Sequence, residues 1–446
     1  MSTPAATRGG FAGAVSLLLL ARLATVASLF GAHVIGARLL TPEVLGSAAV
    51  GQTVGMIAAL IANGGLNIAT IYFLKQEAER RAELVPRLVA LGMGACALAV
   101  VIVLVSAPLM LGWVVGASAW PLMVAAALLG AAIIAFEFTG ALLLGLGRTG
   151  WFAVVELVRG LGALAAVGIL LLGPWPDDSG FIVGLTLGYA LAAVIGLVTT
   201  GRSGVPVFPV YDGALAGRAI RFGVRGQAGN VFQFLGVRLD LLLVPALLDL
   251  RAAGVYLIAV RTSDVVGQVA TAASSLVFPR VADPNERRSR ELTERTTRMS
   301  LLIVGAAALA LAISGEAVLG LFFGEAYTEG IGALLVLLVA ALPLALGRIL
   351  SADLKGRGRP GLVSWASLGM VAATLVLDLI LIPAYGITGA AGASLLAYTI
   401  GACALVLAYR SVAGGRARAL VPTWADVREV VATARRVVSG PSPRTQ

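Results

Sequence analysis

The chain has 446 residues, of which 59% are hydrophobic and only 13% are charged, about half the charged fraction of an average soluble domain. This composition excludes a water-soluble protein, because the polar residues needed to cover the surface of such a chain are missing. The net charge of +10 requires no nucleic-acid partner, since the basic residues stand in short segments between apolar stretches.

Twelve apolar stretches follow one another, each long enough for a helix that crosses ~30 Å of hydrocarbon. The first resembles a signal peptide, but it continues past Arg22 to about Gly36, so we expect it to be a membrane helix. The predicted helices are 11–37, 45–73, 88–108, 119–146, 151–172, 180–200, 219–247, 252–278, 299–321, 330–353, 361–383 and 387–410. The predicted fold class is therefore an all-α, polytopic membrane protein.

Basic residues fall almost entirely on one side of this predicted bundle. With a cytoplasmic N-terminus, 26 of the 33 Lys and Arg residues stand in cytoplasmic segments, and only Arg38 and Arg251 stand in outward ones. Basic loops mark the cytoplasmic side of a membrane protein. We therefore predict a multi-pass protein of the cytoplasmic (inner) membrane with both termini in the cytoplasm.

The chain after Arg410 is more polar. An apolar stripe at helical spacing begins at Trp424 and Val427, which fits an amphipathic helix on the cytoplasmic leaflet or an ordinary surface helix. We predict that 416–446 form a basic amphipathic segment and a disordered tail.

Two short segments recur in the second half of the chain. Leu39–Gly46 aligns with Leu247–Gly254 at an offset of 208, and Gly145–Gly150 aligns with Gly356–Gly361 at an offset of 211. We expect tight turns at the glycine-rich pair, because no strand precedes them and no Lys-Ser/Thr follows, as a phosphate-binding loop would require. The repeats predict two parallel six-helix lobes, 1–205 and 206–415, with a substrate cleft between them.

Polar residues recur at helical spacing on the first two helices of each predicted lobe. Such stripes mark faces turned away from lipid, and we predict that the four faces line one central cavity. The candidate substrate-binding residues are Arg22, Gln52, Asn63, Asn230, Arg238, Arg261 and Gln268, and the candidate coupling or cavity residues are His33, Asp240 and Asp264.

Charges inside membrane helices are costly, so pairing within the bundle is the alternative to a functional role. Glu156 and Arg159 stand three residues apart, as a local ion pair does. Arg261 and Asp264 share that spacing, and both interpretations stay open for them. Arg22 and Arg238 have no acid three or four residues away, which favours function. His33 is a proton carrier or a packing histidine, and Arg348 also lies within a predicted helix.

Several motifs are similar to those of a known family. They are Ala37-Arg-Leu-Leu-Thr-Pro-Glu-Val-Leu-Gly46, Phe222-Gly, Arg238-Leu-Asp240, Phe278-Pro-Arg280 and Tyr385-Gly-Ile-Thr-Gly-Ala-Ala. They resemble the polysaccharide-repeat flippases of the O-antigen (Wzx) type, relatives of the multidrug and toxin extrusion (MATE) proteins and of the lipid II flippases. The resemblance implies two six-helix lobes that alternate access without ATP. It also implies a polyprenyl-diphosphate-linked oligosaccharide as cargo, with Arg22, Arg238 and Arg261 holding the diphosphate.

The leading hypothesis is a flippase of cell-envelope polysaccharide biosynthesis that moves this cargo from the inner to the outer leaflet. The alternative is a cation-coupled multidrug exporter, but Arg22 stands in the first helix, where an exporter of cations would be expected to have an acid. The membrane potential, H+ or Na+ is the expected driving force, and membrane lipids and a polysaccharide polymerase are expected partners. We expect no enzymatic activity, metal or cofactor.

Overall fold

The computed structural model describes residues 8–116, 119–281, 289–414, 416–428 and 432, and this part of the chain contains helices and no strand. The predicted all-α fold is confirmed, and every predicted span is helical. In the described part, ten helical segments are long and apolar enough to cross a membrane. The count of twelve stays a prediction.

The chain forms two compact units. Unit 1 consists of Met1–Val231, Leu241–Ile258 and Gly320–Tyr327, and unit 2 of Phe232–Asp240, Ala259–Leu319 and Thr328–Gln446. The predicted lobe boundaries remain a prediction.

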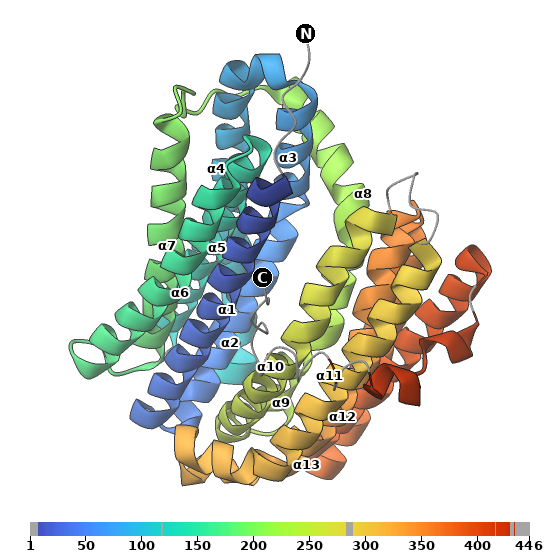
Figure 1. Cartoon of the computed structure of the whole chain (residues 1–446). Helices are drawn as coiled ribbons and strands as arrows, with labels where there is room; N and C mark the ends of the chain where they lie inside the picture. Colours follow the sequence, from blue (N-terminus) through green and yellow to red (C-terminus); the bar gives the residue numbers. More distant parts are fainter. Residues whose placement is uncertain (1–7, 117–118, 282–288, 415, 429–431, 433–446) are drawn as a thin grey trace, which may run out of the picture. The chain divides into compact units, whose positions relative to one another are not determined.

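Unit 1 is built on the first seven helices. They are α1 (Arg8–Leu39), α2 (Pro42–Asn63), α3 (Leu66–Gln76), α4 (Arg81–Met110), α5 (Trp120–Gly145), α6 (Thr149–Leu172) and α7 (Asp178–Gly201). Helix α6 packs between α1 and α7, while α5 contacts α2, α4 and α7 (Figure 1). Small residues allow this packing, since a Cβ on Gly160 of α6 would lie 2.7 Å from the Cα of Thr25 on α1.

Further helices connect and complete the two units. Helix α8 (Gly213–Arg238) and α10 (Leu250–Val281) each contribute to both units, and α9 (Asp240–Leu247) lies between them in the chain. Unit 2 also contains α11 (Ser289–Val318), α12 (Ile331–Gly356) and α13 (Pro360–Ala413). Helix α13 is kinked at Gly386, where φ is +61°, so its two arms correspond to the last two predicted spans.

The helix boundaries repeat along the chain. Helices α4 and α11 each continue into a π-helical turn, Leu111–Val115 and Leu319–Phe323, and the two turns begin 208 residues apart. Helices α5 and α12 begin 211 residues apart. The offset grows by three because the second half has a longer connection before α12, which includes a 3₁₀ turn at Glu325–Gly330. The predicted duplication is therefore visible in the fold.

The two glycine-rich segments form the same helix-ending turn. Gly147 and Gly358 have φ of +78° and +72°. In each turn the following arginine donates its backbone N–H to a carbonyl five residues back, from Arg148 to Leu143 at 2.7 Å and from Arg359 to Leu354 at 2.9 Å. This is the hydrogen-bond pattern of a Schellman cap, and the prediction of tight turns is confirmed.

The other repeated pair of segments meets inside unit 1. Gly46 of α2 lies against the carbonyl of Leu250, and a Cβ on it would be 3.0 Å from the backbone N of Gly254. Gly254 of α10 lies in turn against the carbonyl of Pro42. The repeated glycine thus serves as the crossing point of two repeat-related helices.

Arg38, one of the two basic residues predicted in outward segments, has a structural partner. Its guanidinium donates to the carbonyl oxygens of Phe322 at 2.9 Å and of Leu321. Both carbonyls belong to the π-helical turn at the end of the α11 segment, where backbone acceptors lack helical donors. Arg38 therefore caps this turn within unit 1.

The segment after α13 docks on unit 2. Leu420 is buried in a cluster with Leu354, Val363 and Tyr409, and both carboxylate oxygens of Asp426 accept from Arg298 of α11, at 3.0 and 3.1 Å. Trp424 is 81% exposed. Of the predicted amphipathic helix, residues 424–428 are described and are helical. The part beyond Arg428 lies outside the described residues, apart from residue 432.

Candidate functional site

The strongest concentration of buried charge in the described chain lies in unit 2, where α8 ends and α9 begins. Arg238 is the last residue of α8 and Asp240 is the first of α9. Interrupted membrane helices are typical of transporter binding sites, because the freed backbone and side chains face a cavity. Nη2 of Arg238 donates to Oδ2 of Asp264 on α10 at 2.6 Å, and both side chains are largely buried.

Three guanidinium groups converge on the Asp264 carboxylate. Arg261 lies one turn before it on α10, with an N–O distance of 3.6 Å. Arg348 of α12 is close enough to attract it electrostatically, while its Nη1 donates to the carbonyl of Gly267 at 3.1 Å and to the hydroxyl of Thr271 at 2.9 Å. The cluster is thus richer in positive than in negative charge.

A small cavity with several polar residues in its lining adjoins this cluster. It has a volume of about 30 Å³, and the polar part of its lining consists of Arg238, Asp240, Ser263, Asp264, Arg348 and Tyr398. A cavity of this size holds about two water molecules. The rest of its wall is apolar and includes Leu337 and Leu344, so the arginines adjoin a space that is polar on one side only.

Two further buried carboxylates belong to unit 2, Asp240 in the cavity lining and Asp378 on α13. Asp240 is 2% exposed and accepts a hydrogen bond from Ser394 at 3.2 Å. Asp378 is fully buried, and neither of its carboxylate oxygens has a hydrogen-bond partner in the described part of the chain. Asp240 is near enough to Asp378 to repel it electrostatically. A buried carboxyl group without a hydrogen bond is costly inside a membrane helix, which makes Asp378 a candidate functional residue.

The candidate residues that belong to unit 1 make contacts of their own within that unit. Asn63, at the end of α2, donates its amide to Glu137 of α5 at 2.6 Å. Gln52 is buried on α2, and Arg22 is exposed on α1. Asn230 donates to Gln227 at 3.1 Å, within one turn of α8.

His33 occupies a packing position. It is 4% exposed, its Nδ1 lies 2.8 Å from the carbonyl oxygen of Leu29, and its ring meets Phe181 edge to face at 5.4 Å. Nδ1 is therefore protonated and donates along the helix. These contacts favour the packing interpretation over that of a proton carrier.

Arg159 shows what a structural arginine looks like in the same protein. It donates to Glu156 at 2.8 Å and to the hydroxyl of Tyr189 at 3.1 Å, and it lies over the rings of Phe136 and Tyr189. Its faces and both of its terminal nitrogens have partners. The predicted local ion pair is confirmed.

The remaining members of the unit 2 site differ in how far the sequence could reveal them. Gln268 lies one turn after Asp264 and contacts its backbone carbonyl at 3.5 Å. Arg348 is a charge inside a predicted membrane helix, but it belongs to no polar stripe, so the sequence pattern predicts no role for it. Asp378 is likewise a charge inside a predicted helix that belongs to no polar stripe, and Tyr398 has no local sequence signal beyond its polarity.

Comparisons with known proteins agree with this architecture. Residues 181–331 match the family described as "Polysaccharide biosynthesis protein". The probable low-salt glycan biosynthesis flippase Agl15 of Haloferax volcanii is 25% identical over 166 residues, which are 36% of this chain and 35% of that protein. The aligned region therefore spans about a third of this curated relative.

Solved structures match over nearly the whole length. A lipid II flippase, MurJ in an inward closed conformation, matches with a TM-score of 0.69 and 11% identity. The match covers 94% of this chain and 93% of the flippase chain. An inward-facing multidrug resistance MATE family transporter of the MOP superfamily has a TM-score of 0.62 with 15% identity, covering 87% and 94%. The chain shares its fold with these two proteins. The resemblance inferred from the sequence is confirmed, and the chain is a multi-pass membrane protein.

Proposed function

We propose that the chain is a flippase that moves a polyprenyl-diphosphate-linked oligosaccharide from the inner to the outer leaflet by alternating access between two lobes. The observation that carries the proposal is the convergence of Arg238, Arg261 and Arg348 on one carboxylate beside a helix break. The family match and the flippase relative support the same cargo class.

The chemistry of the cluster suits a diphosphate. Guanidinium groups bind phosphate oxygens in a fork geometry and stay charged when desolvated. Without cargo, Asp264 holds the arginines in place, since unpaired buried charges would be strongly destabilising. A diphosphate can replace the carboxylate as the partner of Arg238 while the other arginines join it. Arg22, Gln52, Asn63, Asn230 and Gln268 remain proposed contacts to the rest of the cargo.

Two driving forces are compatible with this site. Outward movement of one negative charge through an inside-negative membrane gains about 2.3 kcal/mol per 100 mV. In addition, we propose that H+ or Na+ binds at Asp240 and Asp378, where its charge would relieve the repulsion between the two carboxylates. His33 is not needed for either route.

The proposed setting follows from the charge distribution of the loops. We propose from it that the protein lies in the inner membrane with both termini in the cytoplasm. A polysaccharide polymerase is proposed as a downstream partner because of the proposed cargo. Transport rather than covalent chemistry is proposed for the site, since phosphate binding explains its arginines.

Transport by purified protein in liposomes tests the proposal. With a fluorescent oligosaccharide on a polyprenyl diphosphate, Arg238→Ala is expected to lower the flipping rate by about a hundredfold, because a charged hydrogen bond to phosphate contributes up to about 3 kcal/mol. Arg238→Lys keeps the charge without the fork and should be intermediate. The exposed Arg410→Ala is the control and should flip at the wild-type rate.

The multidrug alternative has its own outcome in this assay. The MATE likeness in fold makes it the second candidate. Extrusion of a cationic dye by the wild type, with no movement of the lipid-linked glycan, would replace the flippase proposal with that of an exporter.

A further inference from the structure

A second cavity lies in unit 1, far larger than the polar one of unit 2. It has a volume of about 440 Å³ and is bounded by the end of α2, the start of α3, α4 and the first half of α8. Its lining is apolar except for Asn63 and Tyr211, and includes Leu91, Leu98 and Ile220. We call it the α4–α8 groove.

The groove exists because small residues leave space. Helices α2 and α3 are separated by Gly64 and Gly65, both with positive φ, and Gly65 packs so closely on α8 that a Cβ would lie 2.7 Å from the Cα of Gly223. On the α4 side, a Cβ on Gly94 would meet no atom within 4 Å. Backbone contact thus fixes one edge of the groove while the space beside Gly94 stays open.

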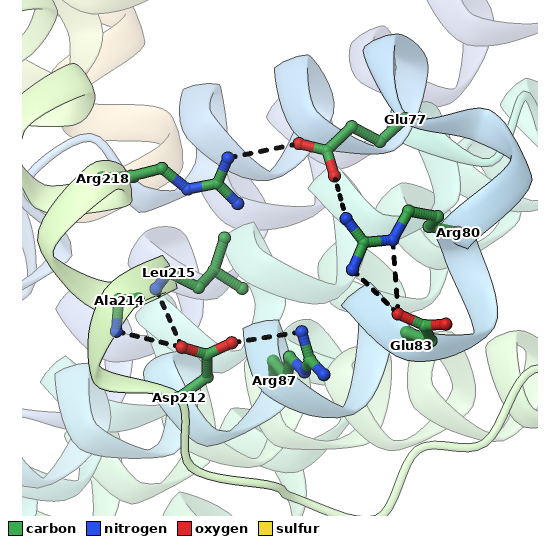
Figure 2. A network of polar contacts seen from close by, with 8 residues as sticks. All are labelled: Glu77, Arg80, Glu83, Arg87, Asp212, Ala214, Leu215 and Arg218. Atoms are coloured by element: carbon green, nitrogen blue, oxygen red, sulfur yellow. Dashed lines mark hydrogen bonds and ion pairs between the residues drawn. The ribbon is translucent and has the colours of Figure 1, made fainter.

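A charged network lies at the end of the groove where α4 and α8 begin (Figure 2). Arg87 pairs with Asp212 at 3.1 Å, and Glu77 bridges Arg80 and Arg218 at 3.6 and 3.5 Å. The arginine side chains are between 33% and 55% exposed. Glu83 also pairs with Arg80 at 3.0 Å, so three carboxylates balance the three arginines. An anion can reach these exposed guanidinium groups, but it binds them by displacing a carboxylate.

Asp212 holds this network to α8. Its Oδ1 accepts the backbone N–H groups of Ala214 and Leu215, each at 3.0 Å, as the capping residue of a helix does. The hydrogen bond from Leu215, with that from Ala214 and the nearby Arg87, lowers the pKa of Asp212. The neighbouring Tyr211 lines the groove, so the charged network and the apolar space form one amphipathic feature.

The occupant of the groove must be a hydrocarbon chain. Water does not fill an apolar cavity, and α4, which packs against α2, α3 and α5 on one side, is apolar and long enough to cross a membrane. Several lining side chains are exposed at the surface of the protein, Ile61 by 48%, Leu98 by 48% and Ile220 by 60%. A chain can therefore enter sideways from the bilayer.

We propose that the α4–α8 groove holds the polyprenyl tail of the cargo while the network of Arg80, Arg87 and Arg218 first receives its diphosphate. The proposal rests on the proposed function and deepens it. The cargo lipid fits better than a bulk phospholipid because the groove ends at Asn63, a candidate substrate residue, and at several arginines. It is a docking position distinct from the arginine cluster of unit 2.

Filling the groove tests this assignment. Gly94→Phe places a ring in open space, and Gly112→Phe, also with no atom within 4 Å of an added Cβ, is the matched control on the π-helical turn that continues α4. In liposomes, Gly94→Phe should slow flipping of a long-chain polyprenyl cargo by about tenfold, equivalent to roughly 1.4 kcal/mol. A cargo with the same diphosphate and glycan on a short prenyl chain should flip at the wild-type rate. Gly112→Phe should leave both rates unchanged.

The outcomes separate the groove from the function. Equal loss on both cargoes, or no loss on either, overturns the groove assignment while flipping by the wild type upholds the function. Failure of the wild type to flip any cargo overturns the function instead. A photoreactive side chain at Leu98 gives an independent reading, since it should crosslink polyprenyl diphosphate in competition with unlabelled polyprenyl diphosphate. Crosslinking to phospholipid that polyprenyl diphosphate does not displace overturns the assignment.

Discussion

Two buried arginines, Arg159 and Arg238, show how much a role depends on surroundings. Arg159 has a carboxylate, a hydroxyl and two aromatic rings around it, whereas Arg238 shares one carboxylate with two other arginines and adjoins a cavity. The spacing of three residues predicted the partner of Arg159, because neighbours on a helix are fixed by its geometry. The partner of Arg238 lies 26 residues away, and only tertiary packing brings it there.

Removal of the partner of Arg159 should affect stability and spare transport. Glu156→Gln leaves a buried guanidinium without its counter-charge, so we expect a loss of about 3 kcal/mol or more. The measurement is thermal unfolding in detergent, with flipping assayed at a temperature where the variant is folded. An unchanged unfolding temperature would contradict the structural role assigned to this pair.

The docked C-terminal segment should show a pH-dependent stability. Burial would raise the pKa of Asp426, but hydrogen bonds from Thr423 and Arg298 hold this pKa below the ordinary 3.8. A lowered pKa in the folded state stabilises the protein above the unfolded-state value, and the stabilisation is lost as pH falls through the folded value. Asp426→Asn should therefore unfold at a lower temperature than the wild type at pH 7.

The difference in unfolding temperature between the wild type and Asp426→Asn should shrink as the pH drops below about 3.8. Since the asparagine has no titratable group there, only the wild-type unfolding temperature carries this part of the pH dependence. A difference that stays constant down to pH 3 would mean that the carboxylate charge of Asp426 does not stabilise the docked segment.

The sequence predicted those features of the helices that depend on residues close together in the chain. The lengths of the apolar stretches predicted the membrane spans, and the repeated Gly-x-Gly-Arg segments predicted the turns after α5 and α12. The π-helical turns at Leu111–Val115 and Leu319–Phe323 were not predicted, because their wider hydrogen bonding leaves no composition pattern. Helix α13 is kinked at Gly386, where Pro383 and Gly386 interrupt the apolar pattern between the last two predicted spans.

The two Schellman turns should respond alike to substitution. Gly147→Ala and Gly358→Ala each force a Cβ into a left-handed backbone conformation, which costs about 1–2 kcal/mol. Gly150→Ala, within α6 and with open space for a Cβ, is the control and should be neutral or stabilising, since alanine favours helix over glycine. Thermal unfolding of the three variants compares them, and a large difference between the two turn variants would contradict their equivalence.

For the molecule as a whole, charge asymmetry and repetition carried more information than any single residue. The repeat offsets, together with six predicted helices in each half, predicted parallel halves, because two copies of six helices cross the membrane in the same sense. The joining of α9, the first part of α10 and Gly320–Tyr327 to unit 1 was not predicted. It depends on close backbone contacts, such as that of Gly46 with Gly254, and on the capping of a distant turn by Arg38.

The orientation of the whole chain is the prediction that the loop charges carry alone. With Cys96 and Cys403 replaced by alanine, single cysteines at exposed Pro176 and exposed Glu79 report the two sides. A membrane-impermeant maleimide should label Pro176→Cys in intact spheroplasts, because the segment between α6 and α7 is neutral or acidic and should face outward. Glu79→Cys, in a segment with Lys75, Arg80 and Arg81, should react only after permeabilisation. The reverse labelling pattern would mean that the chain has the opposite orientation in the membrane. The charged network at the end of the α4–α8 groove would then receive its lipid from the outer leaflet.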